Sequence, residues 1–323
     1  MMNKTVIVGV DIGGTTVKIG FLQNSGDIIE KWEIPTNTAN SGLSIVDDIW
    51  DAISQKAMAL SISQAHILGI GVGAPGFIDS KTGYVYEAVN IGWKDVELAE
   101  QLSSKSGLPV FVENDANIAV LGENWLGAGK NSEDVIAITL GTGVGGGIIA
   151  GGKILNGVNG TAGEIGHITV DPNGYSCNCG RKGCLETLAS ATGFVRQAMN
   201  IIDTNTSSKL AERYRKNGTV TAKDIFELAQ QGDMDSRGII THTAEVIGLA
   251  ISNLTMTLNP SKVLVGGGVS KAGDQLLEPI KQAFKKYALP RTFEACEVRI
   301  AELGNDAGII GAASLVKNHT AKM

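Results

Sequence analysis

The sequence has little of several features that mark particular classes of protein. Its 323 residues include only 4 cysteines, and 33 acidic residues outnumber 27 basic ones, giving a formal net charge of -6. Without an excess of positive charge, the chain is not expected to bind nucleic acid non-specifically. The apolar stretch before Asp11 is too short for a signal peptide or a membrane span. We therefore expect a cytoplasmic protein with no membrane or nucleic-acid partner.

Apolar residues and glycine are abundant. Hydrophobic residues make up 43% of the chain, enough for a substantial core, and the length suggests two domains. The 42 glycines occur in clusters, which indicates tight turns or close approach of the backbone to a ligand.

The spacing of apolar residues predicts a mixed α/β chain. The expected strands are 5–10, 17–22, 28–34, 67–72, 109–112, 135–140, 148–150 and 263–265. The expected helices are 41–60, 96–106, 188–202, 222–231, 236–258, 272–287 and 307–317. A strand, a glycine turn and a second strand occur both near the start and at 135–150, which indicates an internal duplication.

Three glycine-rich turns, at 11–18, 140–147 and 266–269, each follow a predicted strand. Glycines allow successive backbone N–H groups to face an anion, and threonines add hydroxyl donors. One such turn alone would more often be a hairpin or a bulge, but three favour a nucleotide site. The residues expected to contact the nucleotide are Asp11, Gly13, Gly14, Thr15, Thr16, Lys18, Thr142, Gly143, Gly267 and Gly268.

Two further glycine motifs do not support a dinucleotide or Walker A site. The stretch 71–76 has the G-x-G-x-x-G spacing, but Pro75 and the residues after it do not open a helix. Asn124 and Asn131 occupy two essential positions of a Walker A loop near 127–130. The loop at 71–76 is still expected to lie at the end of a strand, beside a small substrate.

One imidazole and three thiols lie close together in the sequence. His167, Cys177, Cys179 and Cys184 match the ligand set of a closed, structural Zn²⁺ site. The alternative is a core histidine beside reduced thiols. Cys296 stands apart and is expected to be a buried free thiol. Glu164 and Glu186 flank the cluster, which would hold both carboxylates in place for the hydroxyls of a sugar.

The pentapeptide 113–117, Glu-Asn-Asp-Ala-Asn, joins a predicted strand to a helix. A carboxylate at the carboxyl end of a strand can meet a substrate held between two lobes, which makes Asp115 a candidate for catalysis. Asp115 or Asn117 could instead cap the helix.

Together these motifs resemble the ROK family of sugar kinases and repressors, in the actin and hexokinase superfamily. Within the family the chain looks most similar to bacterial ATP-dependent glucokinases, through AVNIGW at 88–93 and LGNDAG at 303–308. The motifs that carry the resemblance are the turn at 11–18, GVGAPGFID at 71–79, ENDAN at 113–117, LGTGVGGG at 140–147, EIGH at 164–167, CNCGRKGCLE at 177–186 and LNPSKVLVGGGV at 258–269.

The resemblance implies two ribonuclease-H-like α/β lobes that close on a sugar, with MgATP in the cleft. A small lobe, 1–117, would be completed by the C-terminal helix at 305–323, and 118–304 would form a large lobe with the zinc loop. The family's habit also implies a homodimer.

The resemblance assigns roles to individual residues. Asp115 is implied to be the general base that takes the proton of the sugar 6-hydroxyl as it attacks the γ-phosphate. His167 would offer one ring nitrogen to zinc and the other to the sugar. The implied sugar-binding residues are Gly76, Asn90, Asn114, Asp115, Glu164, His167 and Glu186. The implied residues on the phosphate and Mg²⁺ side are Asp11, Gly13, Thr15, Thr142 and Gly143, with Gly267 and Gly268 on the adenosine side.

Other functions stay open. The sugar could be mannose, fructose or N-acetylmannosamine in place of glucose, since similar polar groups bind several epimers. Polyphosphate could replace ATP. A sugar-responsive repressor is less expected because only ten residues precede Asp11, too few for a DNA-reading helix. An actin-like or chaperone ATPase would have no use for the zinc cluster and its glutamates.

Overall fold

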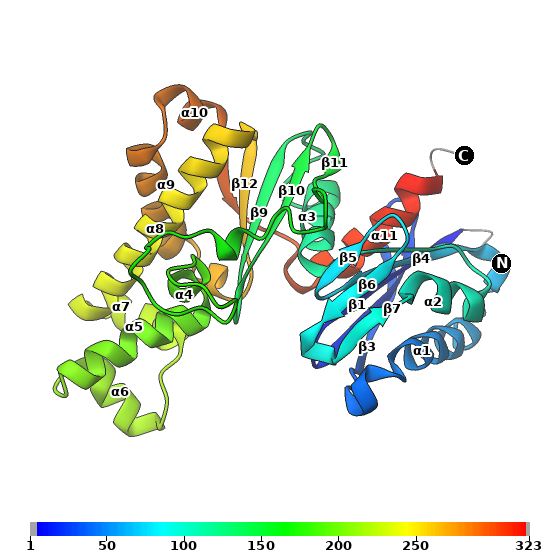
Figure 1. Cartoon of the computed structure of the whole chain (residues 1–323), viewed down its shortest axis with the longest axis horizontal. Coiled ribbons are helices and arrows are strands. Elements are labelled where there is room, and N and C mark those ends of the chain that lie inside the picture. The colour runs from blue at the N-terminus through cyan, green and yellow to red at the C-terminus, as the bar shows by residue number, and fades with distance from the viewer. Residues whose placement is uncertain (1–4, 321–323) are drawn as a thin grey trace.

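The computed structural model describes residues 5–320 of the chain, and two five-stranded sheets organise it (Figure 1). The first sheet has the order β3-β2-β1-β4-β8, with β1, β2 and β3 antiparallel and β1, β4 and β8 parallel. Its strands are β1 (Val6–Ile12), β2 (Thr16–Gln23), β3 (Ile28–Pro35), β4 (Ile67–Ala74) and β8 (Val110–Asn114).

The second sheet repeats the plan of the first. Its order is β11-β10-β9-β12-β13, again with an antiparallel hairpin beside parallel strands. The internal duplication predicted from the two strand and glycine-turn units is confirmed. The strands are β9 (Val135–Leu140), β10 (Val144–Ala150), β11 (Lys153–Ile154), β12 (Lys262–Gly266) and β13 (Glu297–Ile300).

Helices cover both faces of the first sheet. α1 (Ile45–Ala59) and α2 (Leu98–Ser106) pack on one face, and α11 (Ala307–Thr320) packs on the other, against β1 and β4. Burial on both sides explains why β1 is almost continuously apolar, whereas the edge strand β3 alternates half-buried and exposed residues. A small antiparallel sheet of β5 (Phe77–Asp79), β6 (Tyr84–Ala88) and β7 (Trp93–Val96) extends this half.

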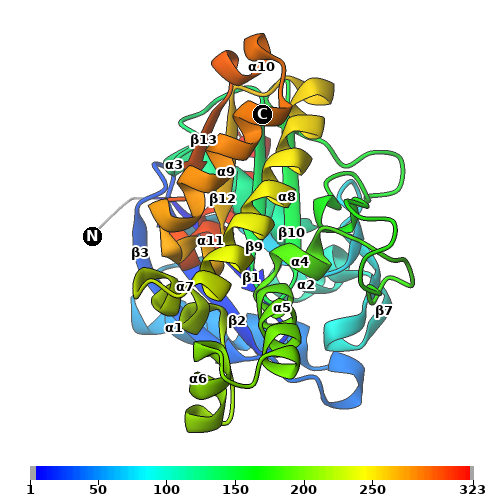
Figure 2. The same cartoon turned by 90° about the vertical axis from the view of Figure 1, so that its left-hand side faces the viewer.

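The second sheet carries most of the remaining helices, which lie together at one end of the long axis in Figure 1, the end that faces the viewer in Figure 2. The long helix α8 has the length and composition of a membrane span, but 56% of its apolar window is buried inside the fold, where it packs on α7 and α9. These helices are α4 (Glu186–Ala189), α5 (Ala191–Thr204), α6 (Lys209–Asn217), α7 (Ala222–Gln230), α8 (Met234–Leu258), α9 (Asp274–Tyr287) and α10 (Pro290–Ala295).

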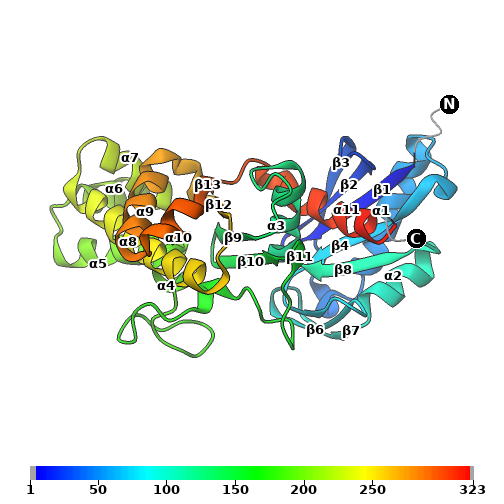
Figure 3. The same ribbon diagram turned by 90° about the horizontal axis from the view of Figure 1, so that it is seen from above.

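One helix joins the two halves. α3 (Asp115–Leu126) follows β8 directly and contacts both α11 of the first half and β10 of the second (Figure 3). The short 3₁₀ segments are η1 (Ala39–Gly42), η2 (Gln64–His66), η3 (Val89–Ile91), η4 (Ile165–His167), η5 (Val269–Ala272) and η6 (Gly304–Asp306).

Some predicted elements need correction. The glycines at 71 and 73 belong to β4 and do not form a loop. A Cβ on Gly71 would lie 1.8 Å from the carbonyl oxygen of Ala312, so this glycine makes room for α11. Of the motif, Pro75 and Gly76 line the cleft. Likewise β10 begins at Val144, so the second glycine turn is confined to 141–143.

The helical pattern at 188–202 is two helices, because the side chain of Ser190 caps α5 by accepting the N–H of Gly193. Val96 ends a strand and does not start a helix. Apolar spacing did not predict α6, whose residues are mostly charged, nor α10, β5, β6, β7, β11 and β13, which are short. The fold class is confirmed: an α/β chain of two related sheets.

Candidate active site

A cavity of about 650 Å³ lies between the two halves of the chain, at the ends of β1, β4, β8 and β9. Residues from both sheets line it, so its walls come from segments that the sequence keeps far apart. Ten predicted site residues meet there: Asp11, Gly76, Asn90, Asn114, Asp115, Gly143, Glu164, His167, Glu186 and Gly267.

The turn at the start of α3 places Asp115 on the cavity wall. Asn114 is the N-cap, and its Oδ1 accepts the N–H groups of Ala116 at 2.9 Å and Asn117 at 3.4 Å. The predictions of Asp115 or Asn117 as the cap are therefore wrong. Nδ2 of Asn114 donates to the carbonyl of Gly76 at 3.0 Å, which leaves one amide hydrogen for a ligand.

Asp115 is exposed to solvent in the cavity, yet protein surrounds its carboxylate on the remaining sides. Its pKa is raised to about 6, mainly by burial and also by the charges of Asp11 and Glu164, while the hydrogen bond from the N–H of Ala116 at 2.8 Å opposes the rise. A carboxylate with this pKa is still ionised at neutral pH and is a stronger base than an ordinary aspartate.

The first glycine turn connects β1 to β2 beside this carboxylate. Gly13 donates its N–H to the carbonyl of Thr16 at 3.0 Å, and a Cβ on Gly14 would lie 3.7 Å from Cβ of Asn90. Burial raises the pKa of Asp11, and Nζ of Lys18 lies 3.8 Å from its carboxylate. The turn residues Gly13, Gly14, Thr15, Thr16 and Lys18 are not among those that line the cavity.

The second glycine turn is tied to Glu186. The N–H of Val144 donates to Oε2 of Glu186 at 3.0 Å, and a Cβ on Gly143 would lie 2.4 Å from the same oxygen. Any side chain at Gly143 would therefore displace Glu186. The adjacent Thr142 does not line the cavity, and its carbonyl accepts the hydroxyl of Thr192 at 2.9 Å.

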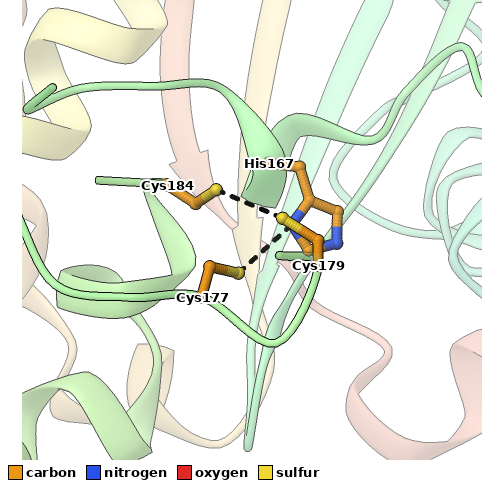
Figure 4. Close-up of side chains that lie close together, drawn as sticks. All are labelled: His167, Cys177, Cys179 and Cys184. Carbon is orange, nitrogen blue, oxygen red and sulfur yellow. Dashed lines mark hydrogen bonds between the residues drawn. The ribbon is translucent and has the colours of Figure 1, made fainter. Parts of the chain in front are cut away.

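The imidazole and three thiols converge as predicted (Figure 4). The ligand atoms of His167, Cys177, Cys179 and Cys184 all lie within 4.8 Å of one another. Sγ of Cys177 lies 3.7 Å from Nδ1 of His167, and Sγ of Cys179 lies 3.6 Å from Sγ of Cys184. Bonds of about 2.1–2.3 Å to a tetrahedral zinc place ligand atoms at such separations, so these four residues could hold the ion.

His167 faces two directions. Its Nδ1 points into the thiol cluster, while its Nε2 lies 3.9 Å from Oε2 of Glu164 on the cavity side. Hydrogen bonds from the backbone and guanidinium of Arg181 lower the pKa of the Cys179 thiol, which favours the thiolate that a metal requires.

A second cavity, of about 670 Å³, lies beside the third glycine turn. Gly268 lines it with residues of α7 and the start of α9, among them Phe226 and Gln275, whereas Gly267 lines the first cavity. No sequence pattern marks Phe226 or Gln275, because only the fold brings α7 and the start of α9 together beside this turn.

A buried group behind Asp115 was also missed. Glu113 is 5% exposed, and its carboxylate accepts hydrogen bonds from Asn117 and Asn156. A charged residue at the end of an otherwise apolar strand was the available signal for Glu113. Nothing in the sequence pattern marks Asn156, which is brought there by a long loop.

The sequence profile of the ROK family matches residues 7–319. Over 323 residues, the chain is 54% identical to a glucokinase of Halalkalibacterium halodurans, covering 100% of this chain and 98% of that protein. The crystal structure of a ROK family glucokinase from Streptomyces griseus in complex with glucose and AMPPNP is 37% identical, with a TM-score of 0.79, covering 97% of this chain and 99% of that one.

A ROK family transcriptional regulator, homologous to the MLC protein of E. coli, is 26% identical with a TM-score of 0.87. The match covers 98% of this chain and 78% of the regulator. The family profile spans nearly all of the described fold, and the similarity to the Halalkalibacterium protein extends over the whole chain. The protein therefore belongs to the ROK family.

Proposed function

We propose that the protein is a glucokinase that transfers the γ-phosphate of MgATP to the 6-hydroxyl of D-glucose. The observation that carries the proposal is the position of Asp115, a carboxylate of raised pKa in a cavity between two sheets. The relatives support the choice of reaction, because a glucokinase is 54% identical over the whole chain and a second one was crystallised with glucose and an ATP analogue.

In this proposal Asp115 accepts the proton of the sugar hydroxyl as its oxygen attacks phosphorus. Phosphoryl transfer depends mostly on positioning and on neutralising charge, so one base on a rigid turn is sufficient. The hydrogen bonds of Asn114 and Ala116 fix that turn at the start of α3. Asp115 can therefore meet the hydroxyl without reorganising the backbone.

The sugar would lie against polar groups from both halves of the chain. Glu164 and Glu186 offer carboxylate oxygens, His167 offers Nε2, and Asn114 offers its remaining amide hydrogen. Gly76 and Asn90 line the same cavity from the first half. These donors and acceptors match a polyhydroxylated ring better than an apolar ligand.

The phosphates would lie between the first two glycine turns, where Gly14, Thr15, Thr16, Thr142 and Gly143 offer N–H and hydroxyl donors. Gly13 would act through the shape of the first turn, because its N–H is bonded to the carbonyl of Thr16. Mg²⁺ prefers carboxylate oxygen, and Asp11 supplies it at the mouth of the first turn, with Lys18 beside it. When bound, the ion would neutralise charge on the transferred phosphoryl group.

The adenosine end would enter the second cavity beside Gly268. The volume of about 670 Å³ is in the range of small-molecule sites, and Phe226 and Gln275 offer an apolar surface and an amide to a base. Gly267 lines the first cavity and Gly268 the second, so this turn lies where the nucleotide would pass from one to the other.

We also propose a structural Zn²⁺ at His167, Cys177, Cys179 and Cys184. Three thiols and one imidazole are the soft donors that zinc takes in closed sites, which leaves no position for a reacting water. The ion would fix the loop that carries Glu186 and the ring of His167.

The remaining proposals concern the boundary between the two lobes, the oligomeric state and the cellular location. We propose a boundary after residue 117, with 305–323 completing the small lobe, of which 321–323 lie outside the described residues. The packing of α11 on β1 and β4 supports this division. A homodimer in the cytoplasm remains the expected state.

A coupled assay tests the function. Purified protein is offered glucose, mannose, fructose and N-acetylmannosamine, each with MgATP and with polyphosphate. We expect glucose with MgATP to give the highest kcat/KM, and a preference for another sugar would replace the proposal. The similarity to a transcriptional regulator makes sugar-dependent DNA binding the second candidate. Specific DNA binding at physiological salt, without phosphorylation of any sugar, would favour it.

A further inference from the structure

The carboxylate of Glu113 is buried directly behind the turn that carries Asp115. Its Oε1 accepts the N–H of Asn114 at 2.8 Å and Nδ2 of Asn117 at 3.0 Å, and its Oε2 accepts Nδ2 of Asn156 at 3.0 Å. Within residues 5–320 no lysine, arginine or histidine forms an ion pair with it. Amide donors alone therefore balance this charge.

Asn156 reaches Glu113 from the other half of the chain. It follows β11 of the second sheet, whereas Glu113 is the last residue but one of β8 in the first. Its Oδ1 accepts Nδ2 of Asn117 at 3.1 Å, and its Nδ2 also donates to Oγ of Ser80. Both hydrogens and the oxygen of this amide are thus engaged, every one of them with the first half of the chain.

The loop that starts at Asn156 leads to the proposed sugar ligands. Gly160 lies against the first half, since a Cβ there would lie 2.8 Å from the carbonyl oxygen of Ile78. The loop then returns to β10 at Gly163, just before Glu164. Asn156 therefore anchors, on the Asp115 side of the cavity, the segment that carries Glu164 and His167.

We propose that Asn156 is a positioning residue for phosphoryl transfer, which rests on the proposed function. Through Glu113 it keeps the turn of Asp115 and the loop of Glu164 in one fixed relation. Without the amide of Asn156, Oε2 of Glu113 would stay buried but lose the hydrogen bond that Nδ2 of Asn156 donates. The turn of Asp115 or the loop of Glu164 would then shift so that water could reach this oxygen. A misplacement of about 1 Å between base and hydroxyl can cost a hundredfold in rate.

The direction of the hydrogen bond gives a sharp test. In Asn156→Asp two carboxylates face each other, and in Glu113→Gln two amide NH₂ groups face each other. In the double variant the new glutamine donates to the new aspartate, so the bond returns with its direction reversed. Each oxygen of that aspartate can still accept from Asn117, and the hydroxyl of Ser80 can turn to donate. One carboxylate is present in the wild type and in the double variant.

We expect each single variant to lower kcat/KM for glucose about 10- to 100-fold, with a raised KM for glucose and an unchanged KM for ATP. The double variant should return to within about threefold of the wild type. A merely structural role would lower the melting temperature and the active fraction without changing the KM for glucose. Asn159→Ala is the matched control, an exposed asparagine of the same loop whose Oδ1 accepts hydrogen bonds from the N–H and hydroxyl of Thr161.

Additive losses in the double variant would overturn the inference, as would an unchanged KM for glucose in both single variants. If Glu113→Gln does not fold, Asn156→Ala compared with Asn159→Ala decides: an equal KM for glucose in the two overturns it. Failure of the proposed function is a separate result, because then the wild type itself does not phosphorylate glucose.

Discussion

Oε2 of Glu186 accepts the backbone N–H of Val144 at 3.0 Å, while its Oε1 lies 3.8 Å from Sγ of Cys177. One glutamate thus joins the thiol cluster to the second glycine turn. In the proposed enzyme, these are the zinc loop and the phosphate loop. Because Glu186 is also a proposed sugar ligand, a change at the thiol cluster should alter the binding of both the sugar and the phosphates.

This relation predicts the effect of losing zinc. We expect one zinc per chain in the wild type, measured by elemental analysis after dialysis, and none in Cys184→Ala. The zinc-free variant should bind glucose more weakly by about tenfold, the value of one hydrogen bond to a charged group. Cys296→Ala is the control, because that buried thiol lies outside the cluster and should leave the zinc content unchanged. Full zinc content in Cys184→Ala would contradict the site.

The second cavity predicts a selective effect on ATP. Gly268 has φ -62° and ψ -35°, and a Cβ there meets nothing within 4 Å, so Gly268→Ala should fold normally. Its methyl group would occupy space beside the proposed adenosine, raising the KM for ATP about five- to tenfold with the KM for glucose unchanged. Gly238→Ala, on α8 and also free of contacts, is the control. Equal KM values for ATP in both variants would remove adenosine from this cavity.

The sequence predicted the parts of this site that depend on residue type and local spacing. The thiol cluster followed from ligand chemistry, and the two hairpins followed from repeated strand and glycine patterns. The role of a glycine inside a strand was harder to predict. Gly71 allows α11 to pack closely on β4, and only the tertiary structure reveals this contact. The capping role of Asn114 was missed because Asn114, Asp115 and Asn117 are all of residue types that cap helices. Asn156 gave no local signal at all.

The raised pKa of Asp115 predicts a pH profile. Burial and the charges of Asp11 and Glu164 hold the pKa at about 6, and the base must be ionised to accept a proton. The kcat/KM for glucose should therefore be constant above this pH and fall about tenfold for each unit below it. Initial rates between pH 4.5 and 8.5, with MgATP saturating, give the curve. Full activity down to pH 5 would assign the base to a different group.

The same shift predicts a change in stability. A folded-state pKa above the unfolded value means that the native state binds the proton more tightly, so the ionised Asp115 destabilises the fold as pH rises from about 4 to about 6. Asp115→Asn removes this charge. Since water reaches the side chain, we expect its melting temperature to exceed that of the wild type by only about 1–2 °C at pH 7.5. The difference should vanish near pH 4, and a lower melting temperature at pH 7.5 would contradict the shift.

The decisive prediction concerns turnover in Asp115→Ala. Asp115 lies at the first position of α3, but the cap is made by Asn114, so the helix should survive the substitution. The loss of a general base lowers kcat by about 10²–10⁴-fold. Glucose affinity, measured by calorimetry or by quenching of intrinsic fluorescence, should change little, because Glu164, His167 and Glu186 remain. Asp203→Ala, an exposed aspartate on α5, controls for the loss of one charge. If Asp115→Ala turns glucose over at a rate comparable to this control, the carboxylate of Asp115 is not the base, and its role is confined to the first turn of α3.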